Sequence, residues 1–183
     1  MLVKDIIKLA CDFTENQEIA NVLENSGVLS EEQSQICDNL VKCFNLVNNE
    51  IVSEYLPLIK MEELKTKDFR IEFSQFKTSP HKIISVKSKS GRSVKFKVFE
   101  NYLIAFANVV DVLYSVLPNK MTIDDEIDST LPERVYAYGV AREYYFMQTL
   151  FDDALVWEER FKNTLQLLSR KQGEVIMPRR RWL

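Results

Sequence analysis

The sequence is poor in the residues that build most catalytic and cofactor-binding motifs. Its 183 residues include one histidine, three cysteines and four glycines. One histidine cannot provide a two-histidine metal site, three cysteines cannot all pair, and no Cys-x-x-Cys motif occurs. The four glycines are isolated from one another, which excludes Gly-rich phosphate-binding and dinucleotide-binding loops. We therefore expect no cofactor and no bound metal, and a protein that is not an enzyme.

Long apolar runs are also absent. No stretch approaches the roughly 18 apolar residues that are needed to cross a bilayer. The first residues carry Asp5 between two lysines and no small-residue cleavage site, so no signal peptide is expected. Hydrophobic residues make up 46% of the chain and charged residues 28%, which is typical of a folded globular protein. These features favour a cytoplasmic origin without membrane contact.

The distribution of charge along the chain is more informative than its total, a formal −3. Residues 1–56 carry 3 basic and 10 acidic groups, whereas residues 57–120 carry 12 basic and 6 acidic groups. Residues 121–169 are again acidic, with 4 basic and 10 acidic groups, and residues 170–183 have 5 basic groups and 1 acidic group. The sign thus alternates over four blocks, and the block boundaries match changes in hydrophobic period.

Residues 1–57 have the periodicity of helices. Apolar residues recur at helical spacing in two short segments that end before Gly27, a residue suited to a helix C-terminus. Ser30 and Gln33 have the spacing of a capping box, which predicts the start of a long helix. Pro57 is expected to stop that helix. This block therefore predicts the N-terminal helices of a bundle.

Residues 121–169 predict the remainder of the bundle, a helix hairpin that follows an acidic loop. The two helices are expected over residues 133–149 and 151–169, and charged residues of the second, such as Glu158, are expected to face solvent. Gly139 is small enough to let another helix approach closely. The first helix is expected to present Val135, Tyr138, Arg142, Tyr145 and Phe146 near one side. The residues expected to pack between helices or subunits are Tyr138, Gly139, Tyr145, Trp157 and Phe161.

Residues 58–120 change to a period of two, in which apolar side chains alternate with polar ones. This alternation predicts antiparallel strands with one solvated face, and Ser90-Gly91 marks a turn between two of them. We expect about five strands in a small sheet or half-barrel. The strand segments are Phe69–Phe73, Lys82–Val86, Val94–Val98, Tyr102–Phe106 and Val109–Val116.

The predicted fold is therefore α+β. It comprises a helical bundle from residues 1–57 and 121–169, an inserted antiparallel β-domain over 58–120, and an extended basic tail over 170–183. The tail has no periodicity, and it can either be solvated or dock on another surface. Arginine and tryptophan are common anchors of interfaces, which favours docking. The expected docking residues are Arg179, Arg180, Arg181, Trp182 and Leu183.

Other candidate sites receive little support from the sequence. His81 lies beside a proline in a predicted turn and has no partners for catalysis. The acidic residues 124–128 lack the spacing and glycine of an EF-hand, so a solvated loop is the simpler interpretation. The lysines of residues 82–97 can contact nucleic acid or an acidic partner, but they alternate with apolar residues as on a solvated sheet face. The cysteines are expected to be buried, small hydrophobic residues.

The order of these blocks resembles that of phage head-to-tail adaptor proteins, also called connector or head-completion proteins. The likeness is strongest in the second half, where a Tyr-Gly-Val-Ala-x-Glu-Tyr core spans Tyr138 to Tyr144. An Ala-x-x-Trp-Glu pattern follows from Ala154 to Glu158. The Arg-Arg-Arg-Trp sequence from Arg179 to Trp182 is similar to tails in phages of Gram-positive hosts.

The resemblance implies a structural virion protein that forms a ring of about twelve copies beneath the portal protein. Such a ring joins the capsid to the tail, contacts the next tail or stopper protein, and lets genome DNA pass through its lumen without specific binding. The tail would reach onto the portal. The implied location is the head–tail junction of the virion, with the host cytoplasm as the site of assembly. The alternative is a nucleic-acid-binding accessory protein that uses the basic sheet and tail.

Overall fold

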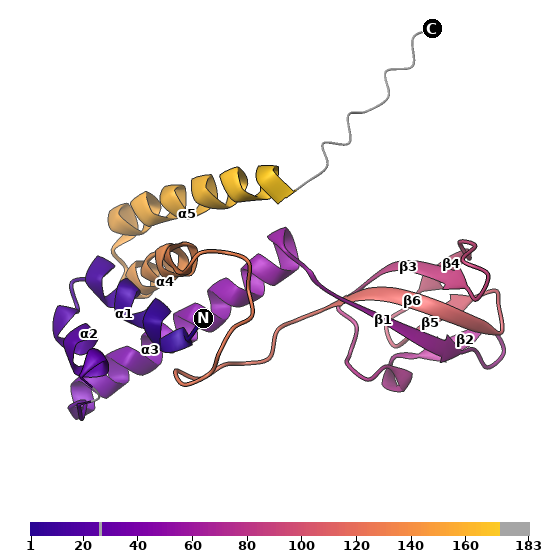
Figure 1. Ribbon diagram of the computed structural model, residues 1–183, viewed down its shortest axis with the longest axis horizontal. Coiled ribbons are helices and arrows are strands. Elements are labelled where there is room, and N and C mark those ends of the chain that lie inside the picture. The colour runs from indigo at the N-terminus through magenta and orange to yellow at the C-terminus, as the bar shows by residue number, and fades with distance from the viewer. Residues whose placement is uncertain (26, 173–183) are drawn as a thin grey trace, which may run out of the picture. The chain divides into compact units, whose positions relative to one another are not determined.

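The computed structural model describes residues 1–25 and 27–172 and divides into two compact units (Figure 1). The helical unit consists of residues 1–50 and the chain from residue 120 onward, and the β unit consists of residues 51–119. The α+β class predicted from the sequence is confirmed by this mixture of helices and antiparallel sheets. The sequence predicts unit boundaries after residues 57 and 120, whereas the structure has them after residues 50 and 119.

The helical unit is formed by two short N-terminal helices, one long helix and a C-terminal hairpin. The capping box before the long helix is present, because the Ser30 N–H donates to Gln33 Oε1 (3.0 Å) and the Gln33 N–H donates to Ser30 Oγ (3.3 Å). The helix continues beyond Glu50 as a π-helical turn, Ile51–Tyr55, before Pro57. The helices are α1 (Val3–Phe13), α2 (Gln17–Glu24), α3 (Glu31–Glu50), α4 (Glu133–Met147) and α5 (Phe151–Gln172).

Helix α4 is the central element of the helical unit and packs against α1, α3 and α5 (Figure 1). The sequence places Val135, Tyr138, Arg142, Tyr145 and Phe146 near one side of this helix, but burial is not confined to that side because neighbouring helices lie around it. Tyr138 and Tyr145 are only half-buried and Phe146 is exposed, whereas Gly139, Val140, Ala141, Arg142 and Tyr144 are buried. The buried residues of α4 are Val135, Tyr136, Ala137, Gly139, Val140, Ala141, Arg142 and Tyr144.

The acidic loop before α4 is held by the first residues of the chain. The N-terminal ammonium of Met1 donates to the carbonyl of Ile127 (3.0 Å) and forms an ion pair with Glu126 (3.3 Å). The Val3 N–H donates to the carbonyl of Asp125 (3.0 Å). The Asp125 carboxylate accepts hydrogen bonds from Thr122, which hold its pKa below the ordinary value. The loop is thus a structured connection that closes against α1.

The β unit contains two three-stranded antiparallel sheets, with strand orders β1-β6-β3 and β2-β5-β4. The prediction missed β1, whose side chains are mostly exposed on both faces and therefore show no alternation of burial. A bulge between Ile83 and Ser85 interrupts the register of β3 with β6. The strands are β1 (Leu58–Lys65), β2 (Arg70–Glu72), β3 (Lys82–Ser88), β4 (Phe96–Val98), β5 (Tyr102–Ala105) and β6 (Val109–Val116).

Two predicted strands are shorter than expected because their flanking residues leave the sheet. Phe69 has a φ of 62° and is exposed, and Phe73 begins a short 3-10 helix, so β2 keeps only Arg70–Glu72. The predicted strand Val94–Val98 keeps only Phe96–Val98 as β4, because the Val94 N–H donates to the carbonyl of Val86 in β3 (2.9 Å). The predicted turn at Ser90-Gly91 is present, with Gly91 at φ 77° and its N–H donating to Ser88.

One hydrophobic cluster draws side chains from both sheets and forms the core of the β unit. Tyr114 is its largest fully buried member, and the Phe76 ring meets it edge-on at 4.9 Å. The Tyr114 hydroxyl reaches the margin of this core and donates to Glu62. Burial and this hydrogen bond raise the pKa of Tyr114 to about 12, so the hydroxyl remains a donor at neutral pH. The small sheets therefore share a single core.

The C-terminal helix is longer than predicted. Residues 170–172 were expected to belong to the extended tail, but α5 runs to Gln172. The predicted docking residues Arg179, Arg180, Arg181, Trp182 and Leu183 lie outside the described residues.

Candidate functional site

Gly139 lies where α4 crosses both α3 and α5. A Cβ atom at this position would lie 2.6 Å and 2.9 Å from the two methyl groups of Val47 and 3.1 Å from Cε2 of Phe161. These distances are below the van der Waals contact that side chains adopt. The absence of a side chain therefore lets three helices approach one another at this point, and Phe161 is itself fully buried.

An aromatic cluster joins α1 to the C-terminal hairpin. The Phe13 ring stacks on Trp157 with centroids 4.8 Å apart and lies 5.4 Å from Tyr138. The Tyr138 and Trp157 rings are 5.7 Å apart, so the three rings contact one another. The hydroxyl of Tyr145 donates to the carbonyl of Phe13 (3.1 Å), which adds a polar link between the same helices. The five packing residues predicted from the sequence thus lie within the helical unit.

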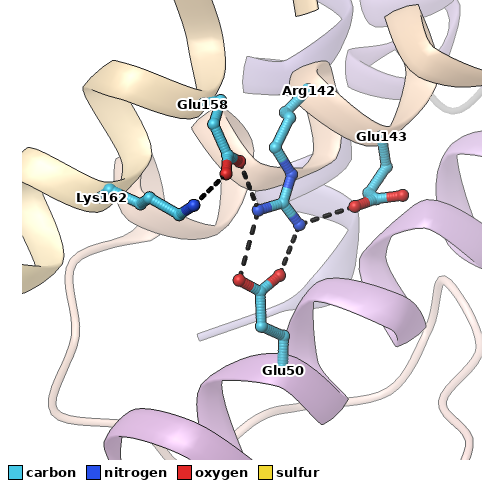
Figure 2. Close-up of polar contacts among 5 residues, drawn as sticks. All are labelled: Glu50, Arg142, Glu143, Glu158 and Lys162. Carbon is cyan, nitrogen blue, oxygen red and sulfur yellow. Dashed lines mark hydrogen bonds and ion pairs between the residues drawn. The ribbon is translucent and has the colours of Figure 1, made fainter. Parts of the chain in front are cut away.

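A buried arginine connects three helices beside this cluster (Figure 2). Arg142 of α4 is only 6% exposed, and its Nη1 donates to Glu158 of α5 at 2.8 Å. Nη2 donates to Glu143 at 2.6 Å, and both Nη atoms donate to Glu50 at the end of α3. Lys162 forms an ion pair with Glu158 from the next turn of α5. We call these five residues the arginine junction.

The charges of the arginine junction stabilise one another. Burial alone would lower the pKa of Arg142, but the hydrogen bonds that it donates to Glu50 and Glu158 outweigh this effect, and the pKa is raised above the ordinary value. Burial alone would raise the pKa of Glu158, but Lys162 and Arg142 outweigh it, and the pKa is lowered. The Arg142 guanidinium also lies 4.8 Å from the centroid of the Phe161 ring. The junction is a structural tie between helices.

The sequence did not predict the arginine junction, and the expectation that Glu158 faces solvent is wrong. A signal was present, because Arg142 occurs among small and apolar residues of a helix, and a buried arginine requires carboxylate partners. The identity of those partners depends on how α3 and α5 pack. In the part of the chain that the structure describes, no group of three His, Cys, Asp or Glu side chains is arranged to hold a metal ion.

The cysteine thiols are buried and unreactive. Burial raises the pKa of Cys11 and of Cys43 to about 12 and also raises that of Cys37. Because the thiolate is the reactive form, none of these side chains is poised as a nucleophile. All three are free thiols, and their predicted role as small buried hydrophobic residues is confirmed.

Exposed apolar side chains gather at the connection between α4 and α5. Six large apolar residues between positions 146 and 156 are each 36% to 59% exposed. Residues 143–159 also contain five acidic groups and no basic group. We call residues 146–156 the acidic elbow. Its exposed apolar members are Phe146, Met147, Leu150, Phe151, Leu155 and Val156.

The β unit has a groove that is lined by apolar residues and two lysines, so its charge is opposite to that of the acidic elbow. The groove has a volume of about 500 Å³ and lies where β1 and the end of β6 meet residues 77–78. Leu58, Ile59 and Leu117 line it and are 42% to 53% exposed. Lys60 and Lys77, both exposed, stand at its sides. We call this feature the basic groove.

The remaining lysines of the β unit lie on its surface. Lys82 and Lys87 are on β3, and Lys95 and Lys97 are at β4; all four are exposed. His81 is exposed just before β3, where its backbone N–H donates to the carbonyl of Ser115 (2.8 Å). Together with Lys65, Lys67 and Lys89, which are also exposed, these residues give the surface of the β unit positive charge.

Comparison of the chain with protein-family models and with curated proteins finds no match. Within residues 1–25 and 27–172, no helix combines the length and apolar character that crossing a membrane requires.

Proposed function

We propose that this chain is a structural virion protein, a head-to-tail adaptor that forms a ring beneath the portal. The ring joins the capsid to the tail and lets DNA pass through its lumen. Its partners are the portal protein, further copies of the chain, and the next tail or stopper protein. The sequence likeness from Tyr138 to Tyr144 and from Ala154 to Glu158 supports this assignment.

The observation that carries the proposal is the acidic elbow. Six exposed large apolar side chains within eleven residues form a surface that a solitary soluble protein rarely displays. Such surfaces are typical of chains that become buried in an assembly. The buried tie at Arg142 keeps the helices that present this surface fixed with respect to one another.

The charge of the helical unit fits a conduit for DNA. Residues 1–50 and 120–172 carry 10 basic and 19 acidic groups. An acidic wall repels the phosphate backbone, so it lets the polyanion slide without the bound contacts that would slow its transit. The adaptor therefore contacts portal and neighbours tightly and DNA weakly.

The competing class is a nucleic-acid-binding accessory protein, favoured by the exposed lysines of the β unit. Two binding measurements separate the classes: affinity for the portal protein of the same genome, and affinity for duplex DNA over a range of salt concentrations. The adaptor binds the portal and shows little DNA binding. Strong DNA binding that falls steeply with salt, together with no affinity for the portal, contradicts the adaptor proposal.

A further inference from the structure

The acidic elbow and the basic groove both expose apolar side chains and carry opposite charges. The elbow is a turn at which Leu150 and Phe151 are exposed, directly followed by Asp152 and Asp153 at the start of α5. The groove is lined by apolar residues together with Lys60 and Lys77. Both surfaces expose apolar side chains to solvent. The elbow supplies carboxylates, and the groove supplies lysines that can pair with them.

We propose that the acidic elbow of one copy docks in the basic groove of a second copy of this chain. Phe151 and Leu155 enter the groove between Leu58, Ile59 and Leu117, while Asp152 and Asp153 pair with Lys60 and Lys77. This inference rests on the proposed ring, and it assigns the two surfaces that join neighbouring copies.

One of the two groove lysines, Lys60, is held in position by a hydrogen bond. The Lys60 ammonium donates one hydrogen bond to Thr78 Oγ1 (2.8 Å), which fixes its position and leaves further N–H groups for an incoming carboxylate. The nearby Glu62 carboxylate already accepts hydrogen bonds from the Lys77 N–H (3.1 Å) and from the Tyr114 hydroxyl. The charges of Lys77 and Lys60 also help to lower the pKa of Glu62, so the elbow carboxylates have to compete with Glu62 for these lysines.

The elbow lies at one end of the helical unit. Within the helical unit, the α4–α5 connection lies on the side of α1 and α2, whereas the C-terminal end of α3 lies on the other side (Figure 1). The elbow is therefore presented at the end of the unit away from the residue at which α3 ends.

The proposed contact is heterologous, because it joins two different surfaces of the same chain. A heterologous contact leaves one elbow and one groove open on every dimer, so it propagates until a ring closes or a filament grows. Opposite charges fix the orientation of the contact and reject elbow-to-elbow pairing.

The first test uses carbodiimide cross-linking, which joins a carboxylate directly to a contacting amine. Wild-type chain labelled with 15N is mixed with unlabelled chain, cross-linked at increasing concentration and digested. The proposal predicts peptides that join Asp152 or Asp153 to Lys60 or Lys77 and that contain one labelled and one unlabelled partner. Absence of these peptides, or their restriction to single copies, overturns the proposal.

The second test reverses the charges. The variants Lys60→Glu/Lys77→Glu and Asp152→Lys/Asp153→Lys are each expected to weaken self-association by about tenfold or more in sedimentation equilibrium, a change of about 1.4 kcal/mol. The chain that carries all four substitutions regains association, because the two charges have been exchanged. The matched control Lys95→Glu/Lys97→Glu makes the same change of net charge on exposed residues elsewhere in the β unit and leaves association unchanged.

Folding of each variant is checked by circular dichroism and thermal melting, and the four-substitution chain guards against simple misfolding. Failure of the four substitutions to restore association, with both pairs folded, contradicts the proposed pairing. Association that instead disappears when Glu174–Leu183 is deleted assigns the C-terminal segment as the occupant and overturns the proposal.

Portal binding is measured in parallel, so that the two proposals fail separately. If the chain binds the portal but no elbow–groove cross-links form, this inference is excluded and the adaptor role is retained. If the cross-links form but the chain has no affinity for the portal, the adaptor role is excluded and the proposed self-association surface is retained.

Discussion

The guanidinium of Arg142 and the carboxylate of Glu158 lie 2.8 Å apart and tie the two helices of the C-terminal hairpin together (Figure 2). Glu50 adds α3 to the same pair, so one buried side chain coordinates three helices. The helices that present the acidic elbow are the ones tied in this way. The rigidity of that surface therefore depends on Arg142 and Glu158, which flank it in sequence, and on Glu50, which is remote from it.

Replacing Arg142 with methionine should destabilise the protein by about 3 kcal/mol, at the low end of the range for breaking a buried ion pair. Three carboxylates would remain close together without their shared cation, although each is still about one-quarter exposed to water. Urea unfolding measures the change. Arg134→Met, at an exposed position of α4, is the matched control and should have little effect. Equal stability of the two variants would contradict the assigned role of the junction.

The junction should also make stability depend on acid pH. The pKa of Glu158 is lowered in the folded protein from its ordinary 4.5, so its contribution is fully present above that value. The contribution is lost as the pH falls through the lowered folded pKa. Melting temperature measured from neutral to acid pH should therefore fall less steeply for Glu158→Gln than for the wild type. Parallel curves for the two proteins would rule out this linkage.

Gly139→Ala should destabilise the helical unit by about 1–3 kcal/mol through overpacking. The added methyl group would meet both methyl groups of Val47, and this strain exceeds the gain in helix propensity. Val47→Ala in the same chain removes the clash, so the double variant should lose less stability than the sum of the single changes. Additive losses in a double-mutant cycle would show that the two sites are independent.

Trp157→Ala should cost about 3 kcal/mol, the low end of the range for a large aromatic residue. The indole is half-buried, yet it stacks on Phe13 and contacts Tyr138. Thermal or denaturant unfolding measures the loss, and Trp157→Phe should recover part of it. An unchanged melting temperature would instead place the ring among the residues that contact partners.

The sequence predicted the fold class well because its two periodicities are local properties. The capping box at Ser30 and Gln33 and the turn at Gly91 act through neighbours in sequence, so they could be identified directly. Strand β1 could not be identified from the sequence. It is defined by its pairing with β6, and its residues do not form an apolar face. The place of Glu158 depends on Arg142, sixteen residues earlier, and on Glu50 in another helix. Polar contacts between residues that are far apart in the sequence produce no periodic pattern from which they could be predicted.

Deleting Glu174–Leu183 should abolish portal binding and leave the fold intact. The segment holds the predicted docking residues Arg179 to Leu183 and follows the end of α5 at Gln172, so its loss removes the expected interface anchors and no residue of the described helices. Portal pull-down measures binding, and circular dichroism with thermal melting checks the fold. Full portal binding by the truncated chain would exclude this segment as the docking element.

The adaptor assignment is tested most directly by electron microscopy of this protein mixed with the portal of the same genome. The account predicts a rotationally symmetric ring of added density at one end of the portal, with neighbouring copies in contact. A portal without added density, in the presence of excess protein that remains monomeric, would contradict it.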